Sequence, residues 1–284
     1  MAKNHHMSTK RRVGQTILYI VLILIAIYTL FPVAFLIINA FKPQAEIVGS
    51  PLALPKTWNF SYIANAADQI HFFKALGITF LVTVISVALL VIVSSLAAWV
   101  MVRNKNKFSS VLLLMFTAAM LIPFQAVMYP LLNLFEGIYL KNLTGLILMY
   151  GGFGLSLSVF LYHGFIKSVP ASIEEAAVID GANIFQLFFR VVFPLLKSTT
   201  ATVIILNAMW IWNDYLLPFL VIGNGEVRTL TLELYFAKMT SGQYGNPWEL
   251  IFPAVFVSII PIIVVFLFLQ KYIVKGVSDG AIKA

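Results

Sequence analysis

Residues 174–194 read EEAAVIDGANIFQLFFRVVFP, a charged and amphipathic segment with a glycine near its middle. The segment lies between apolar runs of about 20 residues, long enough to cross the hydrocarbon core of a bilayer as helices. A membrane protein that keeps such a segment between two spans is expected to present it to another molecule. The interpretation of the whole chain starts from this contrast.

The composition is that of an integral membrane protein. Of the 284 residues, 61% are hydrophobic and only 11% are charged, and there is no cysteine for disulfide or thiolate chemistry. Apolar runs predict an all-α protein with six transmembrane helices, at residues 14–38, 76–101, 110–133, 143–166, 199–221 and 250–272. The first run is too long for a cleavable signal segment, so we expect it to be retained as the first span.

The basic residues predict the orientation. Six spans put both termini on one side, which then holds 13 of the 19 Lys and Arg residues. By the positive-inside rule this side is the cytoplasm. We therefore expect cytoplasmic tails over residues 1–13 and 273–284, and a six-span domain over residues 14–272 with a cytoplasmic loop at residues 167–198. This topology accounts for the net charge of +8, and we expect no nucleic-acid partner.

A short helix is predicted to begin near Pro170. Ser172 lies three residues before Glu175, which is the spacing of a capping box, and a proline just upstream suits a helix start. One face of this helix carries residues at helical spacing: Ile173, Ala176, Ala177 and Asp180. Because alanine side chains are small, another surface could approach this face closely.

A second helix is predicted after Gly181, where the chain can change direction. Asn183 and Gln186 repeat the cap spacing, and Pro194 is expected to close the helix before the fifth span. The apolar stripe of this second helix consists of Ile184, Leu187, Phe188, Val191 and Val192.

The charges of the first helix favour a protein partner over a lipid surface. Helices that lie on lipid headgroups usually carry Lys or Arg on the polar face. Glu174, Glu175 and Asp180 would instead turn negative charge toward an anionic leaflet.

The spacing in this segment resembles a known signature. Glu175-Ala176-Ala177, three residues, Gly181, nine residues and then residues 191–194 (VVFP) are similar to the EAA signature of inner-membrane permeases of ABC importers. Val191 and Phe193 stand where the signature usually has Ile and Leu, which are conservative departures.

Three further stretches resemble carbohydrate permeases related to the smaller subunit of the maltose permease pair. They are FKPQAEIVGSPLALPKTWNFSYIANA at residues 41–66, LIPFQAVMYPLL at residues 121–132 and NAMWIWNDYLLPFLVI at residues 207–222. The resemblance covers the chain from residue 14 onward, and it indicates the family more sharply than any particular sugar.

The resemblance implies a type I ABC importer permease fold, in which residues 171–180 form a cytoplasmic coupling helix seated in a groove of a separate ATPase. The docking residues would be Glu174, Glu175, Ala176, Ala177, Asp180 and Gly181. Glu175 would make the polar contact, the two alanines would allow close seating, and Gly181 would set the bend. No GxxxxGK[ST] motif occurs, so this chain is expected to be no enzyme and to bind no cofactor, with ATP and Mg²⁺ on the ATPase.

The resemblance also implies an assembly in the cell membrane. This chain would form half of a pore with a second permease subunit, as a heterodimer. Two ABC ATPase subunits and an extracytoplasmic solute-binding protein would complete an importer for a sugar, surrounded by membrane lipid. ATP-driven closure would then move the pore between inward-facing and outward-facing states.

Polar residues within the predicted spans are candidate pathway or gate residues, because burying them without partners is costly. They are Gln125, Tyr129, Asn207, Trp210, Asn213 and Asp214. Asp214 lies near the outer end of the fifth run, and Asn207, Trp210 and Asp214 share one helical face. Rings and amides there would suit a carbohydrate, but the same stretch could lock the span to a neighbouring helix or close an outer gate. Close helix packing is expected at the small residues of the fourth run: Gly151, Gly152, Gly154, Ser156 and Ser158.

Other functions have less support. His71 and His163 have no ligand-spaced companions, so a metal site is not expected. An ion-coupled secondary transporter would need coupling sites near the bilayer midplane and usually internal repeats, and the chain has no repeat and only Asp214 charged well inside a span. A permease of the same type for a polyol or another small solute stays open as the alternative to a sugar.

Overall fold

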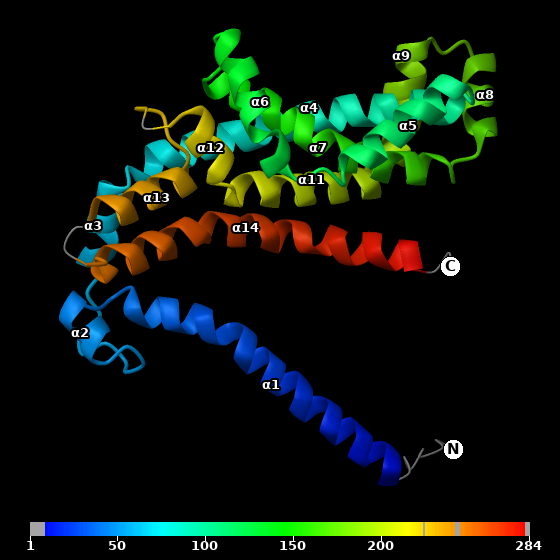
Figure 1. Cartoon of the computed structure of the whole chain (residues 1–284). Helices are drawn as coiled ribbons and strands as arrows, with labels where there is room; N and C mark the ends of the chain where they lie inside the picture. Colours follow the sequence, from blue (N-terminus) through cyan, green and yellow to red (C-terminus); the bar gives the residue numbers. More distant parts are fainter. Residues whose placement is uncertain (1–8, 224, 242–244, 282–284) are drawn as a thin grey trace. The chain divides into compact units, whose positions relative to one another are not determined.

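The structure is a computed structural model that describes residues 9–223, 225–241 and 245–281 (Figure 1). All regular elements in these ranges are helical. The chain divides into two compact units: Met1–Gln69 with Ala237–Val257, and Ile70–Phe236 with Ser258–Ala284. Of the predicted tails, residues 1–8 and 282–284 lie outside the described residues.

Four helices in the described ranges are long and apolar enough to cross a membrane. They are α1 (Thr9–Asn39), α4 (Phe72–Arg103), α7 (Leu143–Ile166) and α14 (Trp248–Ala281). Two pairs of helices pass the same test together but are sharply bent. Counting each bent pair as one span gives six, which agrees with the number predicted from the apolar runs.

The predicted third span, residues 110–133, is not one straight helix. α5 (Lys107–Ala119) and α6 (Phe124–Gly137) meet at a bend of 106°. Pro123 is the N-cap of α6; it lacks an N–H group and disfavours helical backbone in the residue before it, so the first helix cannot continue. Pro130 lies inside α6 and does not end it.

The predicted fifth span, residues 199–221, is also interrupted. α11 (Lys197–Asn213) ends before Asp214, whose backbone is extended (ψ 129°), and α12 (Leu216–Val221) follows. At its other end α11 is bent by 77° from the helical stretch Ile184–Leu195. The apolar run therefore does not predict the break at Asp214 or the bend just before Lys197.

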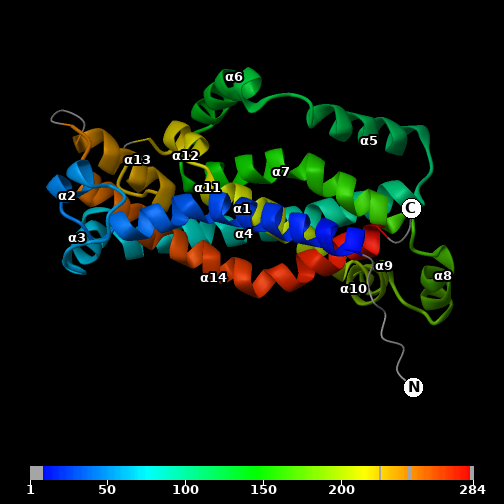
Figure 2. The ribbon, with the colours of Figure 1, turned by 90° about the horizontal axis from the view of Figure 1, so that it is seen from below.

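The segment that opened the sequence analysis folds into short helices of the second unit. They are α8 (Ala171–Ile179), α9 (Ile184–Gln186), the π-helix η1 (Leu187–Val192) and α10 (Phe193–Leu195). Figures 1 and 2 both show α8 and α9 at one end of this unit, and α6 and α12 toward the other.

The second unit is built around α4 and α7, which lie side by side in both views and make its largest helix–helix contact (Figure 2). α11 packs against both. Buried apolar and aromatic side chains fill the space between them, among them Val82, Trp99, Tyr150, Tyr162 and Phe188. Close packing of this kind fixes the end of α4 on which α8 rests.

The first unit contains α2 (Gln44–Gly49) and α3 (Ser61–Gln69) after the end of α1. Its centre is the ring of Phe41, which contacts the rings of Trp58, Phe60 and Phe256 at centroid distances of 5.0, 5.1 and 6.0 Å. Half of Trp58 is exposed, so the ring both packs on Phe41 and reaches the surface.

Lys42 closes the loop that follows α1. Its side chain is fully buried, and Nζ donates to Asn39 Oδ1 (3.2 Å), Ser50 O (3.0 Å) and Pro51 O (3.3 Å). Burial lowers the pKa of the Lys42 ammonium, and the Glu46 carboxylate opposes that shift. The three acceptors make this cation a structural clasp of the loop.

Candidate functional site

The first helix of the segment, α8, starts one residue after Pro170. Pro170 is the N-cap, and no side chain caps the helix. The predicted capping box of Ser172 and Glu175 is therefore wrong. Because the extended backbone of Pro170 (ψ 131°) fixes the start, Ser172 falls inside the first turn instead of at its cap.

The end of α8 is closed by a Schellman motif. Gly181 has φ +85°, its N–H donates to Val178 O (3.0 Å), and Ala182 N–H donates to Ala177 O (3.0 Å). A residue with a Cβ is strained in this left-handed conformation. The predicted change of direction at Gly181 is thus confirmed.

The second predicted capping box is confirmed. Gln186 N–H donates to Asn183 Oδ1 (2.9 Å), and Asn183 N–H donates to Gln186 Oε1 (3.0 Å). The helical stretch then continues through η1 and ends at Leu195, one residue beyond the predicted stop at Pro194. Of its predicted apolar stripe, Leu187, Phe188 and Val192 are buried, Val191 is half-buried and Ile184 is exposed.

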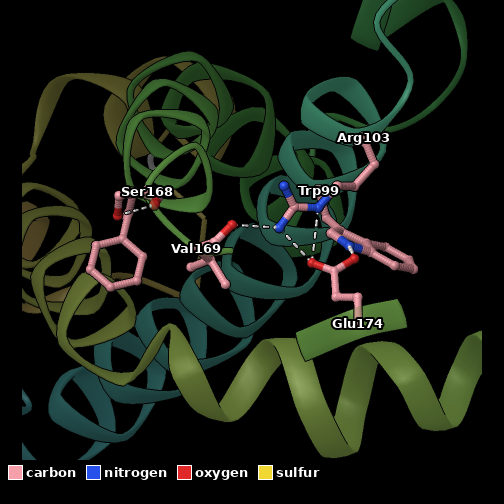
Figure 3. Close-up of polar contacts among 6 residues, drawn as sticks. Trp99, Arg103, Ser168, Val169 and Glu174 are labelled. Carbon is pink, nitrogen blue, oxygen red and sulfur yellow. Dashed lines mark hydrogen bonds and ion pairs between the residues drawn. The ribbon is translucent and has the colours of Figure 1, made fainter. Parts of the chain in front are cut away.

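The inner side of α8 is fixed to α4 by Glu174 (Figure 3). The Arg103 Nε and Nη2 atoms donate to Glu174 Oε1 at 2.9 and 2.6 Å, and Trp99 Nε1 donates to Oε2 at 2.9 Å. Arg103 Nη2 also donates to Val169 O (3.1 Å), just before α8. Glu174 is buried, and both of its carboxylate oxygens accept hydrogen bonds from within the chain.

The outer side of α8 is open. Glu175, Ala176 and Asp180 are exposed, and so is Gly181, whereas Ala177 is half-buried. Consecutive residues of a helix point about 100° apart, which is why Glu174 and Glu175 face different surroundings. The six predicted docking residues therefore divide into one inward anchor, Glu174, and an outward group.

A groove of about 790 Å³ runs between the end of α4 and α8. Its apolar lining includes Trp99 and Val100 of α4, Val178 and Ile179 of α8, and Leu187 of η1. Ile179 is 86% exposed at the end of α8. The outward surface next to the groove thus combines apolar side chains with the carboxylates of α8, a mixture that suits a protein partner.

Asp214 sits at the break between α11 and α12 and is held by three residues. Tyr150 Oη donates to Oδ2 (3.0 Å), and Leu216 N–H donates to Oδ1 (2.9 Å). The Thr231 hydroxyl donates to the Asp214 backbone carbonyl (2.7 Å). The ring of Trp210 packs edge-on against Tyr150 with centroids 5.4 Å apart. Asp214 and Trp210 thus meet at Tyr150, on α7.

The other polar residues of α11 do not join this group. Asn207 is buried and donates from Nδ2 to Ser158 Oγ (3.0 Å) on α7. A Cβ at Gly154 would lie 2.5 Å from Asn207 Oδ1, so the predicted close packing is present there. It is absent at Gly152, which is exposed and where an added Cβ would meet no atom within 4 Å. Asn213 is exposed and bonds the carbonyl of Met209 in its own helix. The predicted single stripe is split because the helix ends at Asn213.

Gln125 and Tyr129 lie on α6 and are exposed, Tyr129 to 71%. In the part of the chain that the structure describes, neither side chain makes a hydrogen bond. α6 has no buried residue at all, so its surface is available to lipid, to the pathway or to another subunit.

Sequence reasoning missed Trp99, Arg103 and Tyr150. Arg103 lies 71 residues before Glu174, and Tyr150 lies 64 residues before Asp214. Each is the partner of a residue that was singled out. The available signal was that Arg103 is the last residue of an apolar run, where a cation next to an acidic loop has a reason to pair.

The chain matches the family model described as "Binding-protein-dependent transport system inner membrane component" over residues 91–279. It is 38% identical to the "Probable starch degradation products transport system permease protein AmyC" of Thermoanaerobacterium thermosulfurigenes, over 92% of this chain and 94% of that protein. It is 34% identical to the "Multiple sugar-binding transport system permease protein MsmG" of Streptococcus mutans, over 93% and 96%.

A third relative is the "Melibiose/raffinose/stachyose import permease protein MelC" of Bacillus subtilis, 31% identical over 98% of this chain and all of that protein. The fold resembles a chain in the crystal structure of a bacterial ABC transporter involved in the import of the acidic polysaccharide alginate. That match has a TM-score of 0.83 and 23% identity, over 94% of this chain and 98% of that one. The chain belongs to the family of inner membrane components of binding-protein-dependent transport systems.

Proposed function

We propose that this chain is the transmembrane permease subunit of an ATP-driven ABC importer for a sugar or oligosaccharide. The three relatives described above carry names that refer to sugars or starch products, and each matches more than nine-tenths of this chain. A polyol is the alternative solute, because it would use similar polar and aromatic contacts.

The two-sided character of α8 is the observation that carries this proposal. Its inner side is fixed to α4 through Glu174, while Glu175, Ala176 and Asp180 face outward. Because α8 is fixed to α4, a movement of a separate ATPase that contacts α8 would be transmitted to α4. ATP and Mg²⁺ are bound by that ATPase, and this chain binds no cofactor.

The surfaces left open support the proposed assembly. Apolar side chains of α1 such as Ile17, Tyr28 and Phe31 are more than half exposed, and lipid or a second permease would cover them. A second, unlike permease subunit supplies the other half of the pathway. An extracytoplasmic binding protein delivers the sugar, and both termini and the loop at residues 167–198 lie in the cytoplasm.

Affinity purification of this chain from its membrane in mild detergent tests the proposal, beside a Glu175→Lys variant. We expect an ABC ATPase and a second permease to co-purify with the wild type. The variant should lose the ATPase and keep the permease, because it reverses the outward charge without touching Glu174. Glu226→Lys, at an exposed glutamate outside this segment, is the matched control and should keep both partners.

Uptake into liposomes decides between the alternatives. An ABC importer should move labelled sugar only with ATP, the ATPase and the binding protein, and competition by sugars or polyols should identify the solute class. Transport by this chain alone, without ATP, would replace the proposal by a secondary transporter.

A further inference from the structure

A second hollow in the unit of α4 and α7 has no role in the proposed coupling. It has a volume of about 950 Å³ and lies between the end of α4, the start of α5 and the end of α7. Figures 1 and 2 show these helix ends at the same end of the unit as α8. No acidic residue lines it, and its polar wall contains Arg103, Lys105, Asn106, Lys107, Ser109, Ser110, His163 and Lys167.

The cations of this hollow are not neutralised within the described part of the chain. Arg103 also borders the hollow, but its guanidinium is used by Glu174. Lys105, Lys107 and Lys167 are exposed, and none of them forms an ion pair there. Three lysines around one hollow, with hydroxyl groups beside them, leave a cationic site that an anion would complete.

The depth of the hollow indicates which anion. α4 and α7 are apolar helices long enough to span a bilayer, and they end at Arg103 and Ile166, on the edge of the hollow. The hollow is therefore at the level where a hydrocarbon core gives way to headgroups. On α5 the turns that follow expose Val111, Leu114 and Met115, each by more than half.

We propose that this hollow binds the phosphate headgroup of an anionic phospholipid, whose acyl chains lie along the exposed apolar face of α5. The lysines and the hydroxyl of Ser109 face the phosphodiester, while the Ser110 hydroxyl donates to the Asn106 carbonyl (3.2 Å). Val111 and Leu114 meet the first methylenes. A free phosphate would use only the cationic wall, and an acidic protein would leave the apolar turns of α5 uncovered. Basic pockets between transmembrane helices are suited to such headgroups.

Native mass spectrometry of the purified full chain, with its co-purifying subunits, tests this site. The wild type is titrated with phosphatidylglycerol and with phosphatidylcholine of the same acyl chains. We expect the wild type to bind phosphatidylglycerol more tightly than phosphatidylcholine, and this comparison requires no variant. Lys105→Gln with Lys167→Gln should weaken the binding of phosphatidylglycerol by about 25-fold, from about fivefold for each lysine near a surface, and leave the binding of phosphatidylcholine unchanged.

The control is Arg190→Gln with Lys197→Gln, which removes two exposed charges from the segment leading into α11, outside this hollow. It should keep the wild-type affinity, and so should Lys105→Arg with Lys167→Arg, which conserves charge and reports on folding. Equal weakening in the control would replace the site by diffuse surface charge. Equal binding of both lipids would overturn the headgroup assignment.

Two further outcomes would identify another occupant. If millimolar inorganic phosphate displaces phosphatidylglycerol and binds equally well in lipid-free detergent, the hollow is a phosphate site. If the glutamine variant keeps its lipid but loses a co-purifying subunit, the lysines contact an acidic protein surface instead. Either result would overturn the proposal.

Discussion

Arg103 and Glu174 lie 71 residues apart in the sequence, yet the Arg103 Nη2 and Glu174 Oε1 atoms are 2.6 Å apart at the junction of α4 and α8. Trp99 Nε1 donates a hydrogen bond to the other carboxylate oxygen, Oε2, so the orientation of the Glu174 carboxylate toward Arg103 is fixed. The neighbouring Glu175 is exposed. Two adjacent glutamates therefore have different physical roles.

Glu174→Gln should destabilise the chain, because it removes the charge that faces Arg103. Removing one partner of a buried pair costs about 3–5 kcal/mol, and the partial exposure of Arg103 reduces this to about 2 kcal/mol. Thermal unfolding of the purified protein should show a lower midpoint, and sugar uptake per ATP hydrolysed should fall.

Glu175→Gln is the matched control, since it makes the same chemical change one residue away. Its unfolding midpoint should stay at the wild-type value, while ATPase association weakens. If both variants unfold alike, Glu174 does not anchor α8.

Gly181→Val should uncouple uptake from ATP hydrolysis and leave membrane insertion intact. The residue has φ +85°, and a β-branched side chain adds about 1–2 kcal/mol of backbone strain there. No atom lies within 4 Å of an added Cβ, so the effect is on direction and not on packing. Gly181→Asn should be milder, because asparagine tolerates this conformation. Wild-type uptake by the valine variant would show that the bend at Gly181 is not needed for coupling.

Asp214→Asn and Tyr150→Phe should have effects that are not additive. Each removes one side of the same hydrogen bond, and a bond to a charged group contributes about 1.5–3 kcal/mol. Unfolding midpoints of the two single variants and the double variant measure the coupling. A raised KM for sugar in Asp214→Asn, with unchanged stability, would favour direct contact with the solute over a lock between α7 and α12.

Gly154→Ala should destabilise the packing of α7 on α11 and α4. The new methyl group would lie 2.5 Å from Asn207 Oδ1 and 2.6 Å from Leu90 Cδ1, and relief of such overpacking costs about 1–3 kcal/mol. Gly152→Ala meets no atom within 4 Å and should be neutral. Equal unfolding midpoints for the two variants would contradict the close approach at Gly154.

Lys42→Met should loosen the loop after α1. The substitution keeps a long apolar stem but removes the ammonium that donates to Asn39 Oδ1 and to the carbonyls of Ser50 and Pro51, at a cost of about 2 kcal/mol. Limited proteolysis should cleave residues 42–59 faster than in the wild type. Lys56→Met changes an exposed side chain and is expected to leave the cleavage rate unaltered.

Local patterns in the sequence predicted local structure well. Four of the six apolar runs correspond to continuous spanning helices. The capping box of Asn183 and Gln186 is present because every atom it needs lies within four residues. The box at Ser172 failed because Pro170, two residues earlier, fixed the helix start. Hydropathy averages over a run, so it could not reveal the break at Asp214 or the 106° bend before α6.

Pairings between distant residues were beyond the sequence. Asp214 was singled out as a lone charge in an apolar run, but its partner Tyr150 is an ordinary residue of another apolar run. Arg103, the partner of Glu174, was likewise not identified, because its charge was used only to predict the orientation in the membrane. Which acidic residue faces inward depends on how α8 rotates on α4, and only the packed structure determines that rotation.

The closure of α8 at both ends by nearby backbone has a practical consequence for design. Its start is set by Pro170 and its end by hydrogen bonds from Gly181 and Ala182, so its shape does not depend on the outward side chains. Replacing Glu175, Ala176 and Asp180 by the corresponding residues of another permease should therefore allow the chain to bind the ATPase of that other transporter. As long as Glu174 is kept, α8 would carry the new side chains at an unchanged position on α4.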